Sequence, residues 1–177
     1  MMINPNDGLK FNMDALKTIY LAGGCFWGVD AYMKRVLGVY ETECGYANGD
    51  TENPTYEEVC HNNTGHAETV KVVYDSAKIS LNELLGEFFS IMNPTTLNRQ
   101  AGDIGSQYRS GVYYTDEADK EIITAFIALK QKDYDKPIVT EVLPLENYYR
   151  AEDYHQNYLD KNPNGYCHVN LSKFKES

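Results

Sequence analysis

The sequence predicts an α+β fold: a single-domain, two-layer sandwich of helices and a mixed, mainly antiparallel sheet, with long irregular loops. β-prone runs and amphipathic helical runs alternate along the chain. Their connections are compatible with antiparallel pairing, which places helices on one or both faces of a sheet. A length of 177 residues is enough for one domain with a core of its own, so we expect a single domain over residues 1–177.

The first half of the chain contains an arm, three strand patterns and one helix pattern. Residues 1–17 carry Pro5 and Gly8 without periodicity and predict an extended arm. Apolar residues at helical spacing predict a helix over 26–37. The polar stretch before the third strand is too long for an ordinary connection, which is typical of a functional loop. Strands are predicted over 18–22, 39–46 and 68–75, the last being the most regular.

The second half opens with a helix whose start is well marked. Ser80 followed by Glu83 is a capping-box pattern, and this helix is expected to end before Pro94. Turn-forming residues predict a mobile C-terminal tail over 160–177. Between them the sequence predicts an irregular loop over 95–109, a strand over 111–114, a helix over 116–132 and a strand over 138–143. The second helix should turn inward the side chains of Ile122, Ile123, Phe126 and Leu129.

Charge and hydropathy exclude two classes of partner. The 26 acidic side chains outnumber the 16 basic ones, and the formal net charge of -10 repels nucleic-acid phosphates and anionic lipid headgroups. No apolar run approaches the ~20 residues that span a bilayer. The N-terminus also lacks the basic and apolar regions of a signal peptide. We therefore expect a cytoplasmic protein without nucleic-acid or membrane partners.

Cys25 is the residue that most directly indicates chemistry. It lies where the first strand gives way to a helix, and the unpaired N–H groups of a helix N-terminus should lower the pKa of its thiol below the ~8.5 of a free cysteine. Gly24 and Gly28 would let another group approach closely. Phe26 and Trp27 place two aromatic rings beside the sulfur, forming an apolar hollow that would bind a thioether or methyl group of a substrate.

These residues also resemble a known family. The run Gly24-Cys25-Phe26-Trp27-Gly28 is similar to the active-site signature of the A-type peptide-methionine sulfoxide reductases, which act on the S epimer. Five ordered blocks are far more specific than one motif, so the resemblance implies an enzyme that returns methionine sulfoxide, free or in oxidised proteins, to methionine. The four further blocks that match the family pattern are Asn-Pro-Thr-Tyr-Glu-Glu-Val-Cys at 53–60, Thr-Gly-His-Ala-Glu at 64–68, Gln-Tyr-Arg-Ser at 107–110 and Ala-Glu-Asp-Tyr-His-Gln at 151–156.

The resemblance implies catalytic roles within these blocks. Cys25 would be the nucleophile that attacks the sulfoxide sulfur and takes up its oxygen as a sulfenic acid. Glu68 would protonate this oxygen, and burial at the start of an apolar strand would keep its proton on at neutral pH. Tyr56 and Tyr108 would donate hydrogen bonds to the same oxygen. Asp103 would support the binding of substrate or water.

A second thiol is needed to resolve the sulfenic acid before it is oxidised further. Cys167 is the best candidate because it lies in a turn-rich tail that is flexible enough to reach Cys25, and similar Gly-Tyr-Cys tails carry the resolving cysteine in some family members. The resemblance implies that thioredoxin or another external dithiol then reduces the disulfide, without a bound cofactor or metal. Cys44 and Cys60 are expected to be packing residues.

Two other functions stay open from the residues alone. The pairs Cys60-His61 and Cys167-His168, with His66, supply zinc-binding side chains, but adjacent Cys-His pairs do not easily turn to one tetrahedral ion and no Cys-x-x-Cys is present. A peroxide-sensing thiol switch or a thiol peroxidase would use the thiols of Cys25 and Cys167, since a low-pKa thiol oxidises readily. The aromatic pair beside Cys25 favours an organic substrate.

Overall fold

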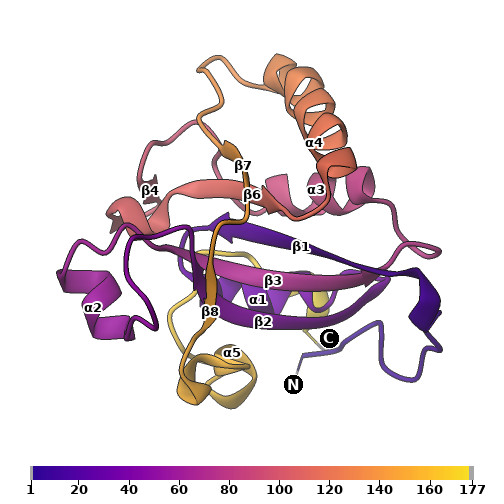
Figure 1. Cartoon of the computed structure of the whole chain (residues 1–177). Helices are drawn as coiled ribbons and strands as arrows, with labels where there is room; N and C mark the ends of the chain where they lie inside the picture. Colours follow the sequence, from indigo (N-terminus) through magenta and orange to yellow (C-terminus); the bar gives the residue numbers. More distant parts are fainter. Residues whose placement is uncertain (1, 176–177) are drawn as a thin grey trace.

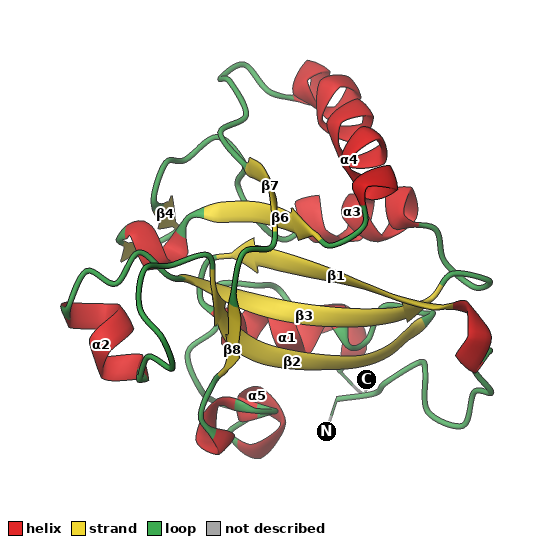
Figure 2. Ribbon diagram, in the orientation of Figure 1, coloured by secondary structure: helices red, strands yellow, loops and turns green. Residues whose placement is uncertain are grey.

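A curved six-stranded sheet forms the centre of the computed structural model, which describes residues 2–175 (Figures 1 and 2). Its strand order is β7-β6-β1-β3-β2-β8; β6 and β7 run parallel, and every other neighbouring pair is antiparallel. Two short strands, β4 and β5, form a separate hairpin. The strands are β1 (Leu16–Gly23), β2 (Val39–Ala47), β3 (Ala67–Asp75), β4 (Arg99–Gln100), β5 (Asp103–Ile104), β6 (Ser110–Tyr114), β7 (Glu141–Pro144) and β8 (Tyr148–Arg150).

Helices cover one face and the ends of this sheet. The buried side chains of α1 and α3 share one apolar cluster with Ile19 and Leu21 of β1, so both helices pack on the same face. The longer α4 packs against α3 and along the β6–β7 edge (Figure 1). This arrangement confirms the predicted α+β sandwich with a mixed sheet. The α-helices are α1 (Phe26–Met33), α2 (Tyr56–His61), α3 (Leu81–Phe89), α4 (Glu117–Lys130) and α5 (Tyr158–Lys161), with 3-10 turns at Met13–Ala15, Ser106–Tyr108, Gln131–Asp133, Asp153–His155 and Ser172–Phe174.

Side chains alternate between two apolar layers along the central strands. Ile19 and Leu21 of β1 are fully buried beneath α1 and α3, whereas Ala22 packs on the opposite face with Tyr113 of β6. The second layer is smaller and is completed by side chains such as Tyr148 of β8. This period of two decides which face each polar residue of a strand occupies.

Most of the predicted elements are confirmed, with shifted ends. The three strands of the first half are β1, β2 and β3, and Ser80 with Glu83 forms the predicted capping box of α3. The helix predicted over 26–37 ends at Met33, and the chain reverses through Gly38 at φ 104°. The strand predicted over 138–143 lies at β7, where parallel pairing with β6 fixes its register. The sequence does not predict the short elements α2, α5 and β8, nor the β4–β5 hairpin within the loop expected to be irregular over 95–109.

The predicted inward face of α4 is partly wrong. Ile123 is fully buried and Phe126 packs against the core, but Ile122 is 41% exposed and Leu129 is 67% exposed. Because α4 lies at the edge of the sheet, only a narrow stripe of its surface is covered. Apolar residues beside that stripe therefore stay in contact with solvent.

The N-terminal arm is held against the turn that follows α1. Asn6 is buried there: its amide donates hydrogen bonds to the carbonyls of Lys34 (3.0 Å) and Val36 (2.9 Å) and accepts one from the N–H of Gly38 (2.9 Å). The N–H of Ile3 donates to a carbonyl near the other end of the chain, that of Phe174, at 2.7 Å. The two termini therefore lie side by side (Figure 1).

The C-terminal tail is docked in this structure. Val169, Leu171 and Phe174 are buried against the main core cluster. At the start of the tail, Asp160 of α5 forms ion pairs with Lys34 and Arg35. The predicted mobility of the tail stays a prediction, and its last two residues, 176–177, lie outside the described residues.

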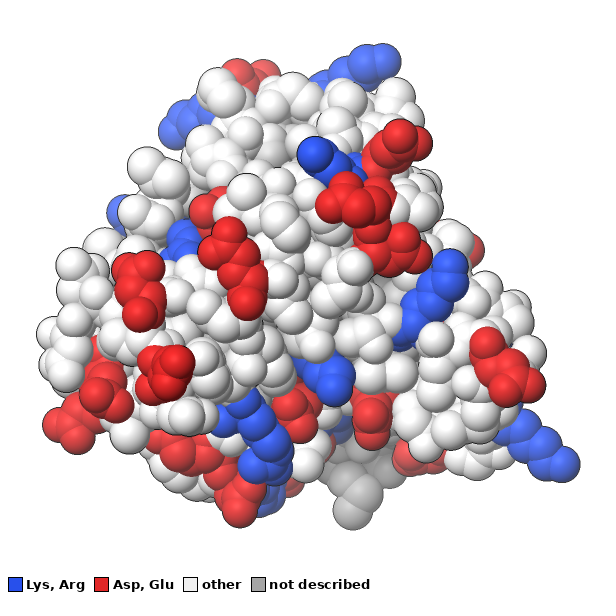
Figure 3. All heavy atoms as spheres, in the orientation of Figure 1, with Lys and Arg blue, Asp and Glu red and all other residues white. Residues whose placement is uncertain are grey.

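Acidic side chains are spread over the face shown in Figure 3, with basic side chains between them, as the net charge of -10 requires. None of the helices formed by residues 2–175 is both long enough and apolar enough to cross a bilayer.

Candidate active site

Cys25 stands at the predicted junction between strand and helix. β1 ends at Gly23, and Gly24 turns the chain at φ 90°, a conformation that favours glycine. Cys25 then occupies the N-cap of α1, where its side chain makes no capping hydrogen bond. Cys25 therefore stands at the N-terminus of the helix, as the sequence predicted.

The two glycines around Cys25 make room for other parts of the same chain. A Cβ atom added to Gly24 would lie 2.7 Å from Cβ of Gln100, and one added to Gly28 would lie 3.0 Å from Sγ of Cys167. The close approach expected at these glycines is present, but the approaching groups are the 95–109 loop and the C-terminal tail. The first turn of α1 thus packs between two segments that are distant from it in the sequence, the 95–109 loop and the C-terminal tail.

Glu68 lies beneath the start of α1. It shares a face of β3 with Val70 and Val72, and its cross-strand neighbour on β2 is Tyr46. Its carboxyl is 1% exposed, and Oε1 accepts a hydrogen bond from the N–H of Phe26 at 3.2 Å. Oε2 has no hydrogen-bond partner among residues 2–175. One carboxyl oxygen is therefore anchored beside Cys25, while the other is buried without a hydrogen-bond partner among these residues.

Burial raises the pKa of Glu68 to about 8. The N–H of Phe26 favours the charged form and opposes this shift, whereas the nearby charge of Asp103 adds to it. Glu68 therefore keeps its proton at neutral pH, in agreement with the prediction from its place at the start of an apolar strand. A protonated carboxyl in such a site is a proton donor.

The pKa of Cys25 is raised, contrary to the sequence prediction. Burial of the thiol is the largest cause, and the charge of Glu68 adds to it, while the N–H of Trp27 acts in the opposite direction. A helix terminus contributes about 0.3–1 kcal/mol, less than one pKa unit, and a thiol that is 8% exposed loses more than that by desolvation. Cys25 therefore rests as a thiol.

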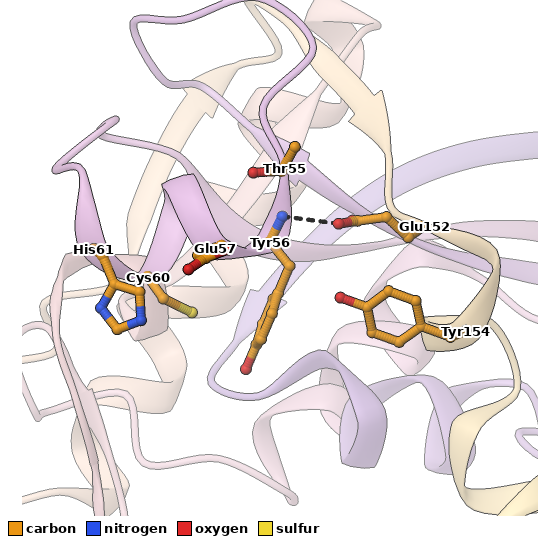
Figure 4. A pocket seen from close by; sticks show the side chains of 7 residues that line it. All are labelled: Thr55, Tyr56, Glu57, Cys60, His61, Glu152 and Tyr154. Atoms are coloured by element: carbon orange, nitrogen blue, oxygen red, sulfur yellow. Dashed lines mark hydrogen bonds between the residues drawn. The ribbon is translucent and has the colours of Figure 1, made fainter.

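Tyr56 is positioned by the start of α2. Thr55 and Glu58 form a capping box, and the N–H of Tyr56 donates to Oε2 of Glu152 at 2.9 Å. The other oxygen of Glu152 accepts a hydrogen bond from the hydroxyl of Tyr46 at 2.8 Å, which ties α2 to β2. Figure 4 shows the Tyr56 ring beside a hollow of about 430 Å³. This hollow is lined by Thr55, Tyr56, Glu57, Cys60, His61, Glu152 and Tyr154.

The two remaining cysteines differ in their surroundings. Cys44 is fully buried on β2, as predicted for a packing residue. Cys60, predicted to be packed as well, is partly exposed and lines the hollow beside Tyr56 (Figure 4). The reason is that Cys60 lies four residues after Tyr56 on α2, one helical turn along the same face.

Tyr108 and Asp103 reach the site from the 95–109 loop. Tyr108 ends the 3-10 turn before β6; burial, followed by the charge of Glu68, raises its pKa well above the usual range, as it does for Tyr56. Both phenols are therefore neutral hydrogen-bond donors. Asp103 lies on β5 and accepts a hydrogen bond at 3.0 Å from the hydroxyl of Tyr166, in the C-terminal tail.

His155 organises the aromatic side of the site. It accepts a hydrogen bond from the indole N–H of Trp27 through Nδ1 at 2.9 Å, and its ring centroid lies 5.0 Å from that of Phe26. The Trp27 ring stacks on Tyr158 at 3.8 Å. Burial lowers the pKa of His155, so the imidazole is neutral and keeps the acceptor that Trp27 needs. The block at 151–156 contained His155, but the residues alone gave no reason to link it to Trp27.

Cys167 lies against α1 from the tail side. It is half-buried, burial raises the pKa of its thiol, and its Sγ donates to the carbonyl of Val169 at 3.1 Å. Its closeness to Gly28 places it one helical turn beyond Cys25 on the same face of α1. The structure thus brings together the candidate nucleophile, the carboxyl of Glu68 and the candidate resolving thiol.

No group of three His, Cys, Asp or Glu side chains within the described part of the chain is placed to hold a metal ion.

We expect Glu68→Gln to stabilise the protein increasingly as pH rises from about 4.5 to about 8. In the unfolded chain the glutamate loses its proton near pH 4.5, but in the folded protein it keeps the proton up to about 8. The wild type therefore loses stability over this window, by at most about 1.4 kcal/mol per pH unit, and no further above it. The amide of the variant cannot ionise and keeps an acceptor for the Phe26 N–H.

Urea denaturation of wild type and Glu68→Gln at several pH values between 4 and 9 measures this difference, since the other titrating groups are common to both proteins. A difference in unfolding free energy that does not change with pH would contradict a buried, protonated Glu68.

Known proteins resemble this chain in sequence and in fold. The chain is 60% identical over 156 residues to the peptide methionine sulfoxide reductase MsrA of Clostridium perfringens, covering 88% of this chain and 99% of the relative. Among solved structures, Mxr1 from Saccharomyces cerevisiae in reduced form superposes with a TM-score of 0.85 at 38% identity, covering 93% of this chain and 97% of that one. Mxr1 in complex with Trx2 superposes with a TM-score of 0.59 at 28% identity, covering 86% and 91%.

The family model described as peptide methionine sulfoxide reductase matches residues 17–177. The match begins within β1 and therefore includes Cys25, Glu68 and the tail with Cys167, while the N-terminal arm precedes it. With this match over most of its length and a relative at 60% identity, the chain belongs to the peptide methionine sulfoxide reductase family, a family of oxidoreductases.

Proposed function

We propose that this enzyme reduces methionine S-sulfoxide, free or in proteins, through a sulfenic acid on Cys25 and a Cys25–Cys167 disulfide that thioredoxin reduces. One observation carries the proposal: a buried carboxyl that keeps its proton at neutral pH lies beside the thiol of Cys25 and has a free oxygen. A sulfoxide oxygen becomes a leaving group only when it is protonated. This pair supplies both the nucleophile and the proton donor.

In the first step the Cys25 sulfur attacks the sulfur of the sulfoxide. Glu68 donates its proton to the sulfoxide oxygen, and the proton of the Cys25 thiol replaces it on the carboxylate. The sulfur–oxygen bond of the substrate breaks, the oxygen ends on Cys25 as a sulfenic acid, and methionine is released. Glu68 finishes the step in the protonation state in which it began, so one group serves as acid and base.

The surrounding residues would bind and polarise the substrate. Burial, followed by the charge of Glu68, raises the pKa of Tyr56 and of Tyr108, so both phenols are neutral and would donate hydrogen bonds to the developing oxyanion. Trp27 would offer apolar surface to the methyl group, with the indole fixed by its bond to His155, whereas Phe26, predicted to share this role, is 1% exposed and packs in the core. Asp103 would support the substrate from the 95–109 loop.

In the second step Cys167 displaces the oxygen from Cys25. A disulfide forms, the sulfur–oxygen bond breaks, and the hydroxide leaves with the thiol proton of Cys167 as water. Thioredoxin then reduces the disulfide by thiol exchange. The complex of Mxr1 with Trx2 supports this choice of reductant. The proposal includes a cytoplasmic location and requires no resident cofactor.

We expect Cys25→Ser to abolish sulfoxide reduction, because a serine hydroxyl is far less nucleophilic than a sulfur that can ionise. The assay supplies the S and R epimers of a methionine sulfoxide peptide separately, with dithiothreitol as reductant. The wild type should convert the S epimer. Retained turnover in the variant would remove Cys25 from the nucleophile role, and faster turnover of hydrogen peroxide than of the peptide by the wild type would favour a thiol peroxidase.

Cys167→Ser should release about one methionine per enzyme in a single turnover and then stop when thioredoxin is the reductant. The sulfenic acid forms normally, but no intramolecular disulfide follows. Cys60→Ser is the matched control, because it removes the other partly exposed thiol, and it should keep thioredoxin-driven cycling. Normal cycling by Cys167→Ser would shift the resolving role to another thiol, and loss of cycling in Cys60→Ser would assign it to Cys60.

Glu68→Gln should lower the rate of methionine release by roughly 10²-fold or more if Glu68 is the general acid. The amide keeps the hydrogen bond to Phe26 but has no proton to give at neutral pH. Glu83→Gln, which changes a helix cap distant from Cys25, should stay within twofold of the wild type and controls for loss of charge. A change of less than tenfold in Glu68→Gln would remove the acid role from this residue.

A further inference from the structure

The tail is joined to the Cys25 region at three successive residues. The hydroxyl of Tyr166 donates to Asp103 at 3.0 Å, and Cys167 packs against Gly28 of α1. His168 places its ring nitrogen Nε2 3.2 Å from the carbonyl oxygen of Gly23. The last of these contacts has no part in the mechanism described above.

The hydrogen bond to Gly23 fixes the form of the His168 ring. A carbonyl oxygen only accepts hydrogen bonds, so Nε2 must carry the proton and Nδ1 is the bare nitrogen. Nδ1 is buried and has no hydrogen-bond partner within the described residues. Burial lowers the pKa of His168, which keeps the ring neutral. The imidazole therefore acts through one bond, from Nε2 to Gly23.

The two residues joined by this hydrogen bond are each close in sequence to one of the two thiols, Cys167 and Cys25. His168 directly follows Cys167, and Gly23 precedes Cys25 by two residues. The His168 ring also packs on Gly24, the residue between Gly23 and Cys25: a Cβ atom added to Gly24 would lie 3.2 Å from Nε2. The hydrogen bond from His168 to the carbonyl of Gly23 thus connects the backbone just before Cys25 to the residue just after Cys167.

Disulfide formation is demanding in geometry. The two Cα atoms must come within about 4.4–6.8 Å, with the sulfur atoms correctly oriented. In the reduced enzyme the thiol of Cys167 donates a hydrogen bond to the carbonyl of Val169 at 3.1 Å, and this bond must break when the sulfur attacks Cys25. A tail that is free to drift while this happens would lower the effective concentration of Cys167 at the sulfenic acid.

We propose that His168 is a positioning residue for the disulfide-forming step: its bond to the carbonyl of Gly23 holds the tail in register while Cys167 attacks the Cys25 sulfenic acid. The inference rests on the proposed function. In this step the sulfur–sulfur bond forms, the sulfur–oxygen bond breaks, and water leaves with the proton of the Cys167 thiol. His168 takes no part in the transfer of protons, and the earlier release of methionine does not depend on it.

Two amide substitutions that differ by one methylene group test the proposal. The amide nitrogen of His168→Gln takes the place of Nε2 and reaches Gly23, whereas that of His168→Asn takes the place of Nδ1 and does not. The enzyme is mixed with a methionine sulfoxide peptide without reductant and quenched at intervals. Released methionine is counted by chromatography, and the Cys25–Cys167 disulfide by mass spectrometry after alkylation of free thiols.

His168→Asn should release methionine at the wild-type rate but form the disulfide about 2- to 10-fold more slowly, the range expected for the loss of one hydrogen bond. His168→Gln should form it within twofold of the wild-type rate. Asn164→Ala, which changes an exposed side chain of the same tail, is the control and should match the wild type in both steps. His168→Leu, similar in size but without a donor, should behave like His168→Asn.

Equal rates of disulfide formation in His168→Asn and the wild type would overturn the proposal. It would also be overturned if the two amide variants were slowed alike, or if methionine release slowed as much as disulfide formation. Failure of the wild type to release methionine would instead refute the proposed function, so the two failures are distinguishable.

Discussion

The register of β3 between β1 and β2 is the constraint on which the site depends. Because side chains alternate along a strand, the register that buries Val70 and Val72 beneath α1 also turns Glu68 to that face. Burying each valine stabilises the fold by about 1.5–3 kcal/mol, enough to offset the cost of burying a neutral carboxyl that has one hydrogen bond. A slip by one residue would exchange Glu68 for Thr69 and remove the acid from the site.

The start of α1 is where segments distant in sequence meet. Glu68 anchors it from below through the N–H of Phe26, and the 95–109 loop presses on Gly24. Cys167 of the C-terminal tail packs against Gly28 of α1, and a hydrogen bond to His155 fixes the Trp27 indole. Packing this close leaves the nucleophile little freedom, which is what preorganisation of a reactive group requires.

Burial of the site has two consequences that are useful together, one for Cys25 and one for Glu68. A thiol with a raised pKa reacts slowly with peroxide, because the thiolate is the form that is readily oxidised. The same burial keeps the proton on Glu68, so the acid is present when a sulfoxide arrives. This protection of the resting enzyme argues against a peroxide sensor, whose thiol must be ionised and accessible.

The sequence by itself determined the local features: the alternation of β3, the capping box of Ser80, and the place of Cys25 between a strand and a helix, since neighbouring residues fix these. The ordered motifs also named Glu68, Tyr56 and Tyr108. Tertiary structure alone decided the rest. The raised pKa of Cys25, the bond from Trp27 to His155 and the contact of His168 with Gly23 arise from burial and from pairs more than 100 residues apart, which no local pattern encodes.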